Sequence, residues 1–526
     1  MIMKNQLALF VLLLMPAAVA QAEDWPQAAG PNANYVVQDG TAPTTWSVVN
    51  NTNIAWTKTL PETGQSTVTI SGGKLYFTCL EPVEADSQLG STLIAYCCDA
   101  KSGKTLWERK IEAKYPLKLS GCFSDSSAPP AVTDGERVCF FNASGTIACF
   151  DLNGKPLWTV ESMAVGRSQP FLIGGSVCYI KQSYMPEQGK FSHAHADDPL
   201  EKWTQLQAIS MKTGKPVWNT TCGVNMGSIP IPWTLADGQQ VIMVGRGGGH
   251  GPPEKPEGVS LVSAKDGSTI WTLPLDGFMS TQTFNIHKDR ALIFHGNSHL
   301  SVDLESGKVI DTTSFVKDVN VLRFIDGKYV HKTETLPGGT KGRSIIQQGN
   351  LLVGDYHYFR SYTHNYIGRI NLTNNQVELL ELPTQLVRES GKDDLLIYTD
   401  DQATPAPGKK KGKGKGIPIQ LRAKFHNDMK NSRGFVVMGD PRSQGNGWGH
   451  HSTAIMTSIG GKLYVPIMNG TVFVLQADAK KLDQKAILAI NDLGPAGGSW
   501  NRASLSYSDG KLYAHTIKQV ICIGKE

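Results

Sequence analysis

The chain has 526 residues, several times the length that one hydrophobic core needs, so it folds either as several domains or as one large repetitive domain. Hydrophobic residues make up 40% of the chain and charged residues 18%, which excludes global disorder, a coiled coil and a membrane bundle. The net charge of +5 is too small, on a chain of this size, for a nucleic-acid-binding protein. The 54 glycines, together with aromatics and few charges, favour an all-β protein.

Residues 1–22 have the pattern of a cleavable signal peptide. Lys4 precedes an apolar run from Leu7 to Met15, and small residues follow as far as Ala22. The run is too short to span a bilayer as a permanent helix, and no other stretch has 18 consecutive apolar residues. We therefore predict a periplasmic or secreted protein that is not an integral membrane protein; the alternative is an uncleaved N-terminal anchor.

One sequence motif, which we call the repeated phrase, recurs along the chain and contains most of the structural information. Good copies end at Trp107, Trp158, Trp218 and Trp271, and a degenerate copy ends at Asp311. Each copy predicts a strand, a turn with glycine where φ is positive, and a second strand near the tryptophan. A second hairpin pattern lies upstream of each copy, so each unit has four short strands. The spacing of 51 to 60 residues between the tryptophans fits one propeller blade with variable loops.

These units predict eight blades, and the last of them is incomplete. The predicted blades cover residues 66–112, 125–160, 167–220, 228–273, 280–312, 343–382, 450–491 and 504–523. The eighth lacks its tryptophan-bearing outer strand, and residues 53–60, with Trp56, have the pattern of the missing piece. We predict one domain over residues 23–526: an all-β, eight-bladed β-propeller of four-stranded antiparallel blades, closed by an N-terminal strand that completes the C-terminal blade.

Two insertions interrupt the repeat. Residues 313–342 are interpreted as a connector, and residues 383–449 as a longer insertion with a Gly/Lys tract that cannot bury apolar area. We expect that tract to be a disordered loop. Its lysines provide a possible contact for an acidic polymer or a membrane surface, against the alternative of a solvated loop without function.

The repeated phrase, Asp/Ser-x-x-x-Gly-x-x-x-Trp, resembles the tryptophan docking motif of pyrroloquinoline-quinone (PQQ)-type β-propellers. That superfamily includes quinoprotein alcohol dehydrogenases and the scaffold lipoprotein of the outer-membrane β-barrel assembly machine. The opening residues 24–32 and the closing residues 510–523 are similar to a secreted bacterial branch of it. The resemblance implies that each docking tryptophan stacks between neighbouring blades and that its indole N–H finds a partner there; these residues are Trp56, Trp107, Trp158, Trp218 and Trp271. The motif does not fix the function.

The resemblance also provides an enzymatic alternative, a PQQ- and calcium-dependent alcohol or sugar dehydrogenase. The calcium-binding Glu, Asn and Asp and the catalytic Asp of those enzymes cannot be matched to positions of this sequence. Adjacent Cys97 and Cys98 resemble the vicinal disulfide of some family members. Both occupy ordinary strand positions, however, and neighbouring side chains of a strand point to opposite faces, so we predict that they are not bonded to each other.

Histidine clusters are the remaining candidates for chemistry. His193, His195, Asp197 and Asp198 offer imidazoles and carboxylates, but a loop alone rarely supplies three or four converging ligands, so we predict no metal site. His295 and His299 flank a hairpin turn and are interpreted as solvent-facing turn residues.

One constellation depends on the architecture. The residues just before each innermost strand are expected to meet around one mouth of the central channel, where they form a basic, aromatic funnel for an anionic or planar ligand. The candidate funnel residues are Arg167, Arg343, Arg502, His450, His451 and Trp500. The alternative is that they pair with acidic neighbours or support packing between blades. The predicted function is therefore an exported binding or scaffold module without catalytic activity, which binds an unknown protein or an anionic or planar ligand at one channel face.

Overall fold

The structure is a computed structural model that describes residues 24–525 with gaps, the longest of which are 119–125, 192–198, 248–254, 337–348 and 398–453. The predicted signal peptide and the Gly/Lys tract lie outside the described residues.

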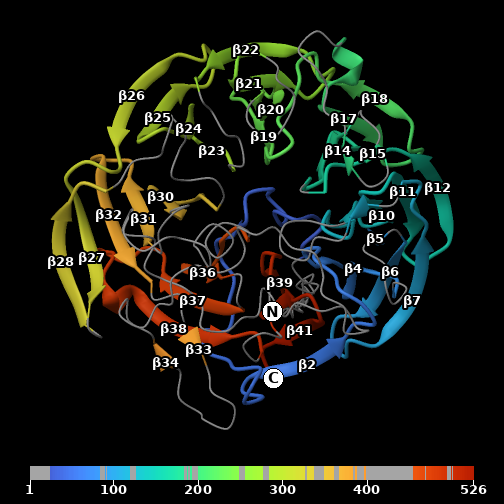
Figure 1. Cartoon of the computed structure of the whole chain (residues 1–526), viewed down its shortest axis with the longest axis horizontal. Helices are drawn as coiled ribbons and strands as arrows, with labels where there is room; N and C mark the ends of the chain where they lie inside the picture. Colours follow the sequence, from blue (N-terminus) through green and yellow to red (C-terminus); the bar gives the residue numbers. More distant parts are fainter. Residues whose placement is uncertain are drawn as a thin grey trace, which may run out of the picture.

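Eight β-sheets stand around a central axis like the blades of a propeller (Figure 1). From the innermost strand outward, the first blade consists of β3 (Thr69–Ser71), β4 (Lys74–Leu80), β6 (Leu93–Asp99) and β7 (Thr105–Ile111), and the second of β9 (Val132–Thr133), β10 (Arg137–Asn142), β11 (Thr146–Asp151) and β12 (Pro156–Glu161). The third blade consists of β13 (Phe171–Ile173), β14 (Ser176–Lys181), β17 (Gln205–Ser210) and β18 (Pro216–Asn219), and the fourth of β19 (Ile231–Thr234), β20 (Gln240–Arg246), β21 (Gly258–Ser263) and β22 (Thr269–Pro274).

The other four blades complete the ring. The fifth blade consists of β23 (Asn285–His287), β24 (Arg290–His295), β25 (Ser298–Asp303) and β26 (Val309–Ser314), and the sixth contains β29 (Leu351–Val353), β30 (Tyr356–Arg360), β31 (Tyr366–Asn371) and β32 (Gln376–Glu381). The seventh blade contains β35 (Thr457–Ile459), β36 (Lys462–Pro466), β37 (Thr471–Gln476) and β38 (Ile487–Asp492), and the eighth consists of β39 (Ser506–Ser508), β40 (Lys511–His515), β41 (Gln519–Ile523) and β2 (Ile54–Thr59). The predicted eight-bladed propeller is confirmed.

The predicted closure of the ring is also confirmed. Strand β2 pairs antiparallel with β41, and Trp56 stands opposite Cys522. The first and last strands of the propeller therefore share one sheet, as Figure 1 shows near the chain ends. Each blade therefore has a neighbour on both sides, which covers the faces of its sheet.

Smaller elements lie beside these sheets or extend them. Three short pairs are formed by β5 (Leu89–Gly90) with β8 (Leu117–Lys118), β15 (Pro186–Glu187) with β16 (Lys190–Phe191), and β33 (Leu386–Val387) with β34 (Leu396–Ile397). Strand β1 (Val36–Val37) pairs parallel with β35, and two short 3₁₀ helices are η1 (Leu200–Lys202) and η5 (Gln484–Ala486). None of the helices in the described part of the chain has the length and apolar character that crossing a membrane requires.

The segment interpreted as a connector contributes to the sixth blade. Strands β27 (Val319–Ile325) and β28 (Lys328–Glu334) form a hairpin, and β27 pairs parallel with β32, so this sheet has six strands. Val321 and Leu322 are buried against the blade. The hairpin therefore covers the outer edge of β32, which the connector interpretation did not foresee.

Each blade docks on the next through its outer strand. The indole N–H of Trp107 donates to the carbonyl oxygen of Leu152 at 3.2 Å, and a Cβ on Gly154 would lie 2.8 Å from the indole ring. The same arrangement joins Trp56 to Ala100 and Gly103, Trp158 to Met211 and Gly214, and Trp271 to Leu304 and Gly307, while Trp218 lies against Gly267. Glycine is needed at these turns both for its positive φ and for the space that the indole occupies.

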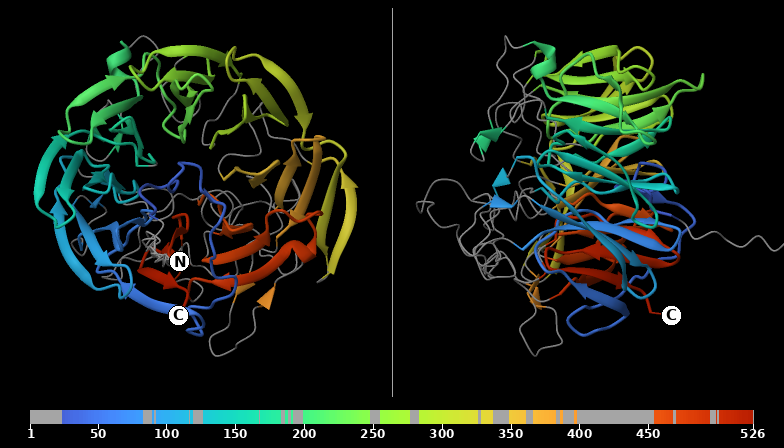
Figure 2. Two further views of the ribbon diagram at one scale, coloured as in Figure 1. Left: turned by 180° about the vertical axis from the view of Figure 1, so that it is seen from behind. Right: turned by 90° about the vertical axis from the view of Figure 1, so that its right-hand side faces the viewer.

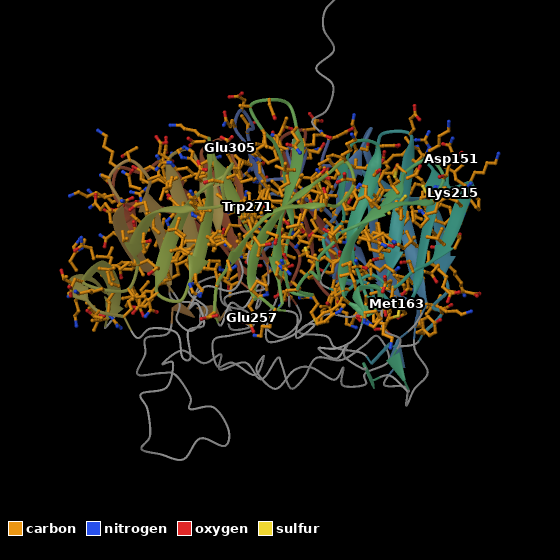
Figure 3. The ribbon with its side chains drawn as sticks, turned by 90° about the horizontal axis from the view of Figure 1, so that it is seen from above. Asp151, Met163, Lys215, Glu257, Trp271 and Glu305 are labelled. Carbon is orange, nitrogen blue, oxygen red and sulfur yellow. The ribbon has the colours of Figure 1, made fainter. Side chains whose placement is uncertain are left out.

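The docking turns share one face of the ring. Figure 3 shows Asp151, Lys215 and Glu305, from the turns of the second, third and fifth blades, at one face, and Met163 and Glu257 at the other. The repeat phase of the sequence therefore decides at which face a residue lies.

Adjacent Cys97 and Cys98 belong to different cores. Cys97 packs with Phe140 of the next blade, and Cys98 lies in the cluster that contains Tyr513 of the preceding blade. Both are buried free thiols, and burial raises the pKa of Cys97 to about 12. Their side chains point to opposite faces of β6, as predicted.

Candidate functional site

The N-terminal segment, residues 24–53, lies across the central channel at one face of the ring (Figures 1 and 2). The Asp24 carboxylate accepts from the backbone N–H of Gly72 at 2.9 Å, and the Gln27 side-chain oxygen accepts from the N–H of Leu172 at 2.8 Å. Farther along, β1 pairs with β35 in the seventh blade. The segment is thus fastened to blades on both sides of the channel.

The opposite end of the channel contains a small polar cavity of about 30 Å³. Its lining consists of residues that precede the innermost strands of the eighth, first, second and third blades: Gln65, Thr67, Ala128, Pro130, Gly166, Ser168, Gln169, Arg502, Ala503 and Ser504. Loops from four adjacent blades meet here, although they lie up to 439 positions apart in the sequence. We call this cavity the channel mouth.

Of the predicted funnel residues, Arg502 lies in the channel mouth. It is partly exposed, and its Nη1 donates to the side-chain oxygen of Gln65 at 3.4 Å. The other predicted funnel residues are outside the described residues, so their convergence stays a prediction; they are Arg167, Arg343, His450, His451 and Trp500.

Sequence analysis did not single out Gln65 and Gln169, which line the same cavity. Both stand in the repeat phase from which the funnel was predicted, but only charged and aromatic side chains were selected there. The side-chain oxygen of Gln169 accepts a hydrogen bond from the hydroxyl of Tyr35, which belongs to the N-terminal segment. The segment at one face therefore reaches a residue that lines the mouth at the other.

The interpretation of His299 as a solvent-facing residue is wrong. Its side chain is 2% exposed, and its Nε2 lies 2.9 Å from Nδ1 of His357 in the neighbouring blade. Burial lowers the pKa of His299 to about 4, and that of His357 also falls well below its ordinary value. The turn ends at Asn297, and His299 already belongs to the buried strand β25.

The part of the chain that the structure describes contains no group of three or more His, Cys, Asp and Glu side chains that could hold a metal ion. His193, His195, Asp197 and Asp198 lie outside that part. The thiols of Cys97 and Cys98 are separated by β6 and do not form a pair facing the channel. These two thiols therefore do not resemble the vicinal disulfide of the dehydrogenase alternative.

Comparison with known proteins agrees with this architecture. A family model described as outer membrane protein assembly factor BamB matches residues 200–406. This segment, which is less than half of the chain, is similar to the PQQ-like β-propeller repeats of that family. No curated protein matches it at a significant level.

Solved structures resemble the chain over almost its whole length. A europium-containing methanol dehydrogenase is 11% identical, with 96% of this chain and 98% of that chain covered and a TM-score of 0.53. A quinohemoprotein alcohol dehydrogenase from Comamonas testosteroni is 14% identical, with 96% and 81% covered and a TM-score of 0.50. Saccharomyces cerevisiae Sqt1 is 5% identical, with 90% and 99% covered and a TM-score of 0.51. At these identities the likeness shows the fold alone.

Proposed function

We propose that this PQQ-like propeller is an exported binding module that takes a carboxylate-bearing group of a partner protein at the channel mouth. The observation that carries the proposal is the convergence of loops from four blades on one polar cavity with a guanidinium in its lining. A guanidinium presents a planar set of N–H donors that matches a carboxylate.

The size of the cavity limits what enters it. About 30 Å³ is room for one or two water molecules, which is the scale of a single carboxylate and not of a whole small molecule. The remainder of the partner would therefore lie on the surrounding face. Because Arg502 is partly exposed, its attraction for the carboxylate weakens as salt screens it.

The test is a fluorescence anisotropy titration with fluorescein-labelled hexaglutamate. We expect binding that weakens with rising NaCl and falls about tenfold or more in Arg502→Gln, because a charge-assisted hydrogen bond is lost. Arg290→Gln is the matched control: Arg290 is also partly exposed, with 48% of its side chain accessible, but it follows the turn after β23, away from the channel mouth. Wild-type affinity in Arg502→Gln would overturn the proposal.

The dehydrogenase alternative has its own assay. Pure protein with added PQQ and Ca²⁺ is supplied with a panel of alcohols and sugars, and reduction of an electron-accepting dye is followed. Our proposal predicts no turnover, and stoichiometric quinone binding with turnover would contradict it.

A further inference from the structure

Tyr35 is the residue through which the N-terminal segment reaches the channel mouth. Its side chain is completely buried, and its backbone has a φ of +61°. This conformation is costly for an aromatic residue and persists only where the surroundings impose it. Here the N–H of Tyr35 donates to the carbonyl oxygen of Ala29 at 2.8 Å, and its own carbonyl oxygen accepts from the N–H of Ser458 at 2.9 Å.

The constrained backbone places the phenol against Gln169. The Tyr35 hydroxyl donates to the side-chain oxygen of Gln169, a residue of the cavity lining. Because this oxygen is engaged by the tyrosine, the amide nitrogen is the end of the side chain that can serve a ligand. An amide nitrogen carries two N–H donors, whereas the oxygen is an acceptor that a carboxylate cannot bind.

The hydroxyl thus decides which end of the amide faces the cavity. Without it, the amide can turn by 180° and present its oxygen to the ligand, since the two orientations have nearly the same shape. Gln169 and Arg502 line the same cavity, so the amide donors that this orientation leaves available, together with the guanidinium, would suit one carboxylate.

We propose that Tyr35 is a positioning residue of the channel mouth: the N-terminal segment crosses the channel and fixes the Gln169 amide so that its N–H donors meet the bound carboxylate. This inference rests on the proposed function. It gives the segment a role in ligand recognition in addition to covering one face of the ring.

A double-mutant cycle on the full chain tests it, with labelled hexaglutamate as the probe. Tyr35→Phe keeps the ring and removes only the hydroxyl, and we expect it to weaken binding about threefold to tenfold, the effect of one hydrogen bond. Gln169→Ala should cost a similar factor, and the double variant should lose no more than Gln169→Ala alone, because Tyr35 acts through Gln169.

Two further variants separate positioning from folding. Tyr507→Phe is the matched control, since the Tyr507 hydroxyl accepts the backbone N–H of Thr41 at 3.1 Å and so also joins the N-terminal segment to the ring, but Tyr507 does not line the channel mouth. The affinity of this variant should equal that of the wild type. Gln169→Glu keeps an acceptor for Tyr35 but replaces the donors by a negative charge, so binding should fall more than tenfold with the fold intact.

The outcomes distinguish this inference from the proposed function. The site stands if the wild type binds hexaglutamate and Arg502→Gln weakens that binding. In that case the role of Tyr35 is refuted if Tyr35→Phe does not change the affinity, or if the double variant loses the combined affinity factors of Tyr35→Phe and Gln169→Ala. If the wild type does not bind hexaglutamate, or Arg502→Gln has no effect, the site itself is refuted and the role of Tyr35 falls with it.

Discussion

Replacing a docking glycine by alanine should destabilise the propeller by more than the backbone conformation explains. Gly154 has a φ of +81°, and a Cβ there would lie 2.8 Å from Trp107 and 3.1 Å from the guanidinium of Arg109. Gly135, in the same blade, has a φ of +86°, but nothing lies within 4 Å of the corresponding Cβ position. At both positions alanine would have to adopt the same left-handed backbone conformation, which costs about 1–2 kcal/mol. Only at Gly154 would its methyl group also contact the indole ring.

The difference between the two variants measures the docking contact. Forcing a methyl group against the ring costs about 1–3 kcal/mol. Displacing the indole also threatens its hydrogen bond to Leu152, worth about 1 kcal/mol. We expect Gly154→Ala to lose about 2–4 kcal/mol more free energy of unfolding than Gly135→Ala, measured by urea titration with circular dichroism.

The presence of Trp107 decides whether this explanation holds. In a Trp107→Ala background, Gly154→Ala should cost no more than Gly135→Ala, because the ring that the new methyl group meets is gone. Equal losses of free energy for the two glycine variants in the wild-type background would refute the argument that the glycine provides space for the tryptophan.

Deleting residues 23–62 removes the strand that closes the eighth blade, so the truncated protein should aggregate or lose cooperative unfolding in gel filtration and thermal melts; a stable monomer would contradict the closure. Mass spectrometry of unreduced peptides should find Cys97 and Cys98 without a bond between them, and a peptide about 2 Da light, one S–H pair lost, would contradict the separation of their side chains. Burial lowers the pKa values of His299 and His515 to about 4, so both stay neutral in the folded chain while the unfolded chain takes up protons below about pH 6.5. The free energy of unfolding should therefore be highest above pH 6.5 and fall by about 3 kcal/mol per histidine as the pH drops to 4, and urea titrations that show no such fall would exclude this burial.

The sequence allowed the blades to be predicted because one local phrase specifies both a hairpin and its contact with the next blade. The tryptophan and the turn glycine stand at fixed positions in each copy, so their phase also predicted that loops before innermost strands meet at one channel end. Arg502 was found in this way. The partner residue Gln169 was not, because an uncharged amide gives no signal of its own in such a loop.

Other features depend on contacts that no local pattern records. Tyr35 is fixed in a left-handed conformation by a strand of the seventh blade, which is far away in the sequence. The hairpin of β27 and β28 does have a local signal, the Asp326-Gly327 pair between two runs of strand-forming residues, yet its pairing with β32 could be seen only in the fold.

The fifth, sixth and seventh blades lack a docking tryptophan, and the first two of them show what takes its place. Asp311 takes the position of the tryptophan in the fifth blade and accepts a hydrogen bond at 2.8 Å from Asn375, which has a φ of +59° in the turn where other blades have glycine. Glu378 takes it in the sixth blade and accepts from the N–H of Leu482 at 3.1 Å.

Docking between successive blades therefore persists with polar partners, but a carboxylate cannot cover the apolar area that an indole covers. In the sixth blade the Glu378 carboxylate is paired instead with the buried guanidinium of Arg369 at 2.7 Å, and a charge pair of this kind needs protection from water to be strong. Arg369 is completely buried, 19% of the Glu378 side chain is exposed, and β27 of the hairpin pairs with the strand that carries Glu378. A missing tryptophan alone does not bring further strands, because the fifth blade carries Asp311 at the same position and has four strands, whereas the sixth blade combines a buried ion pair with two added strands.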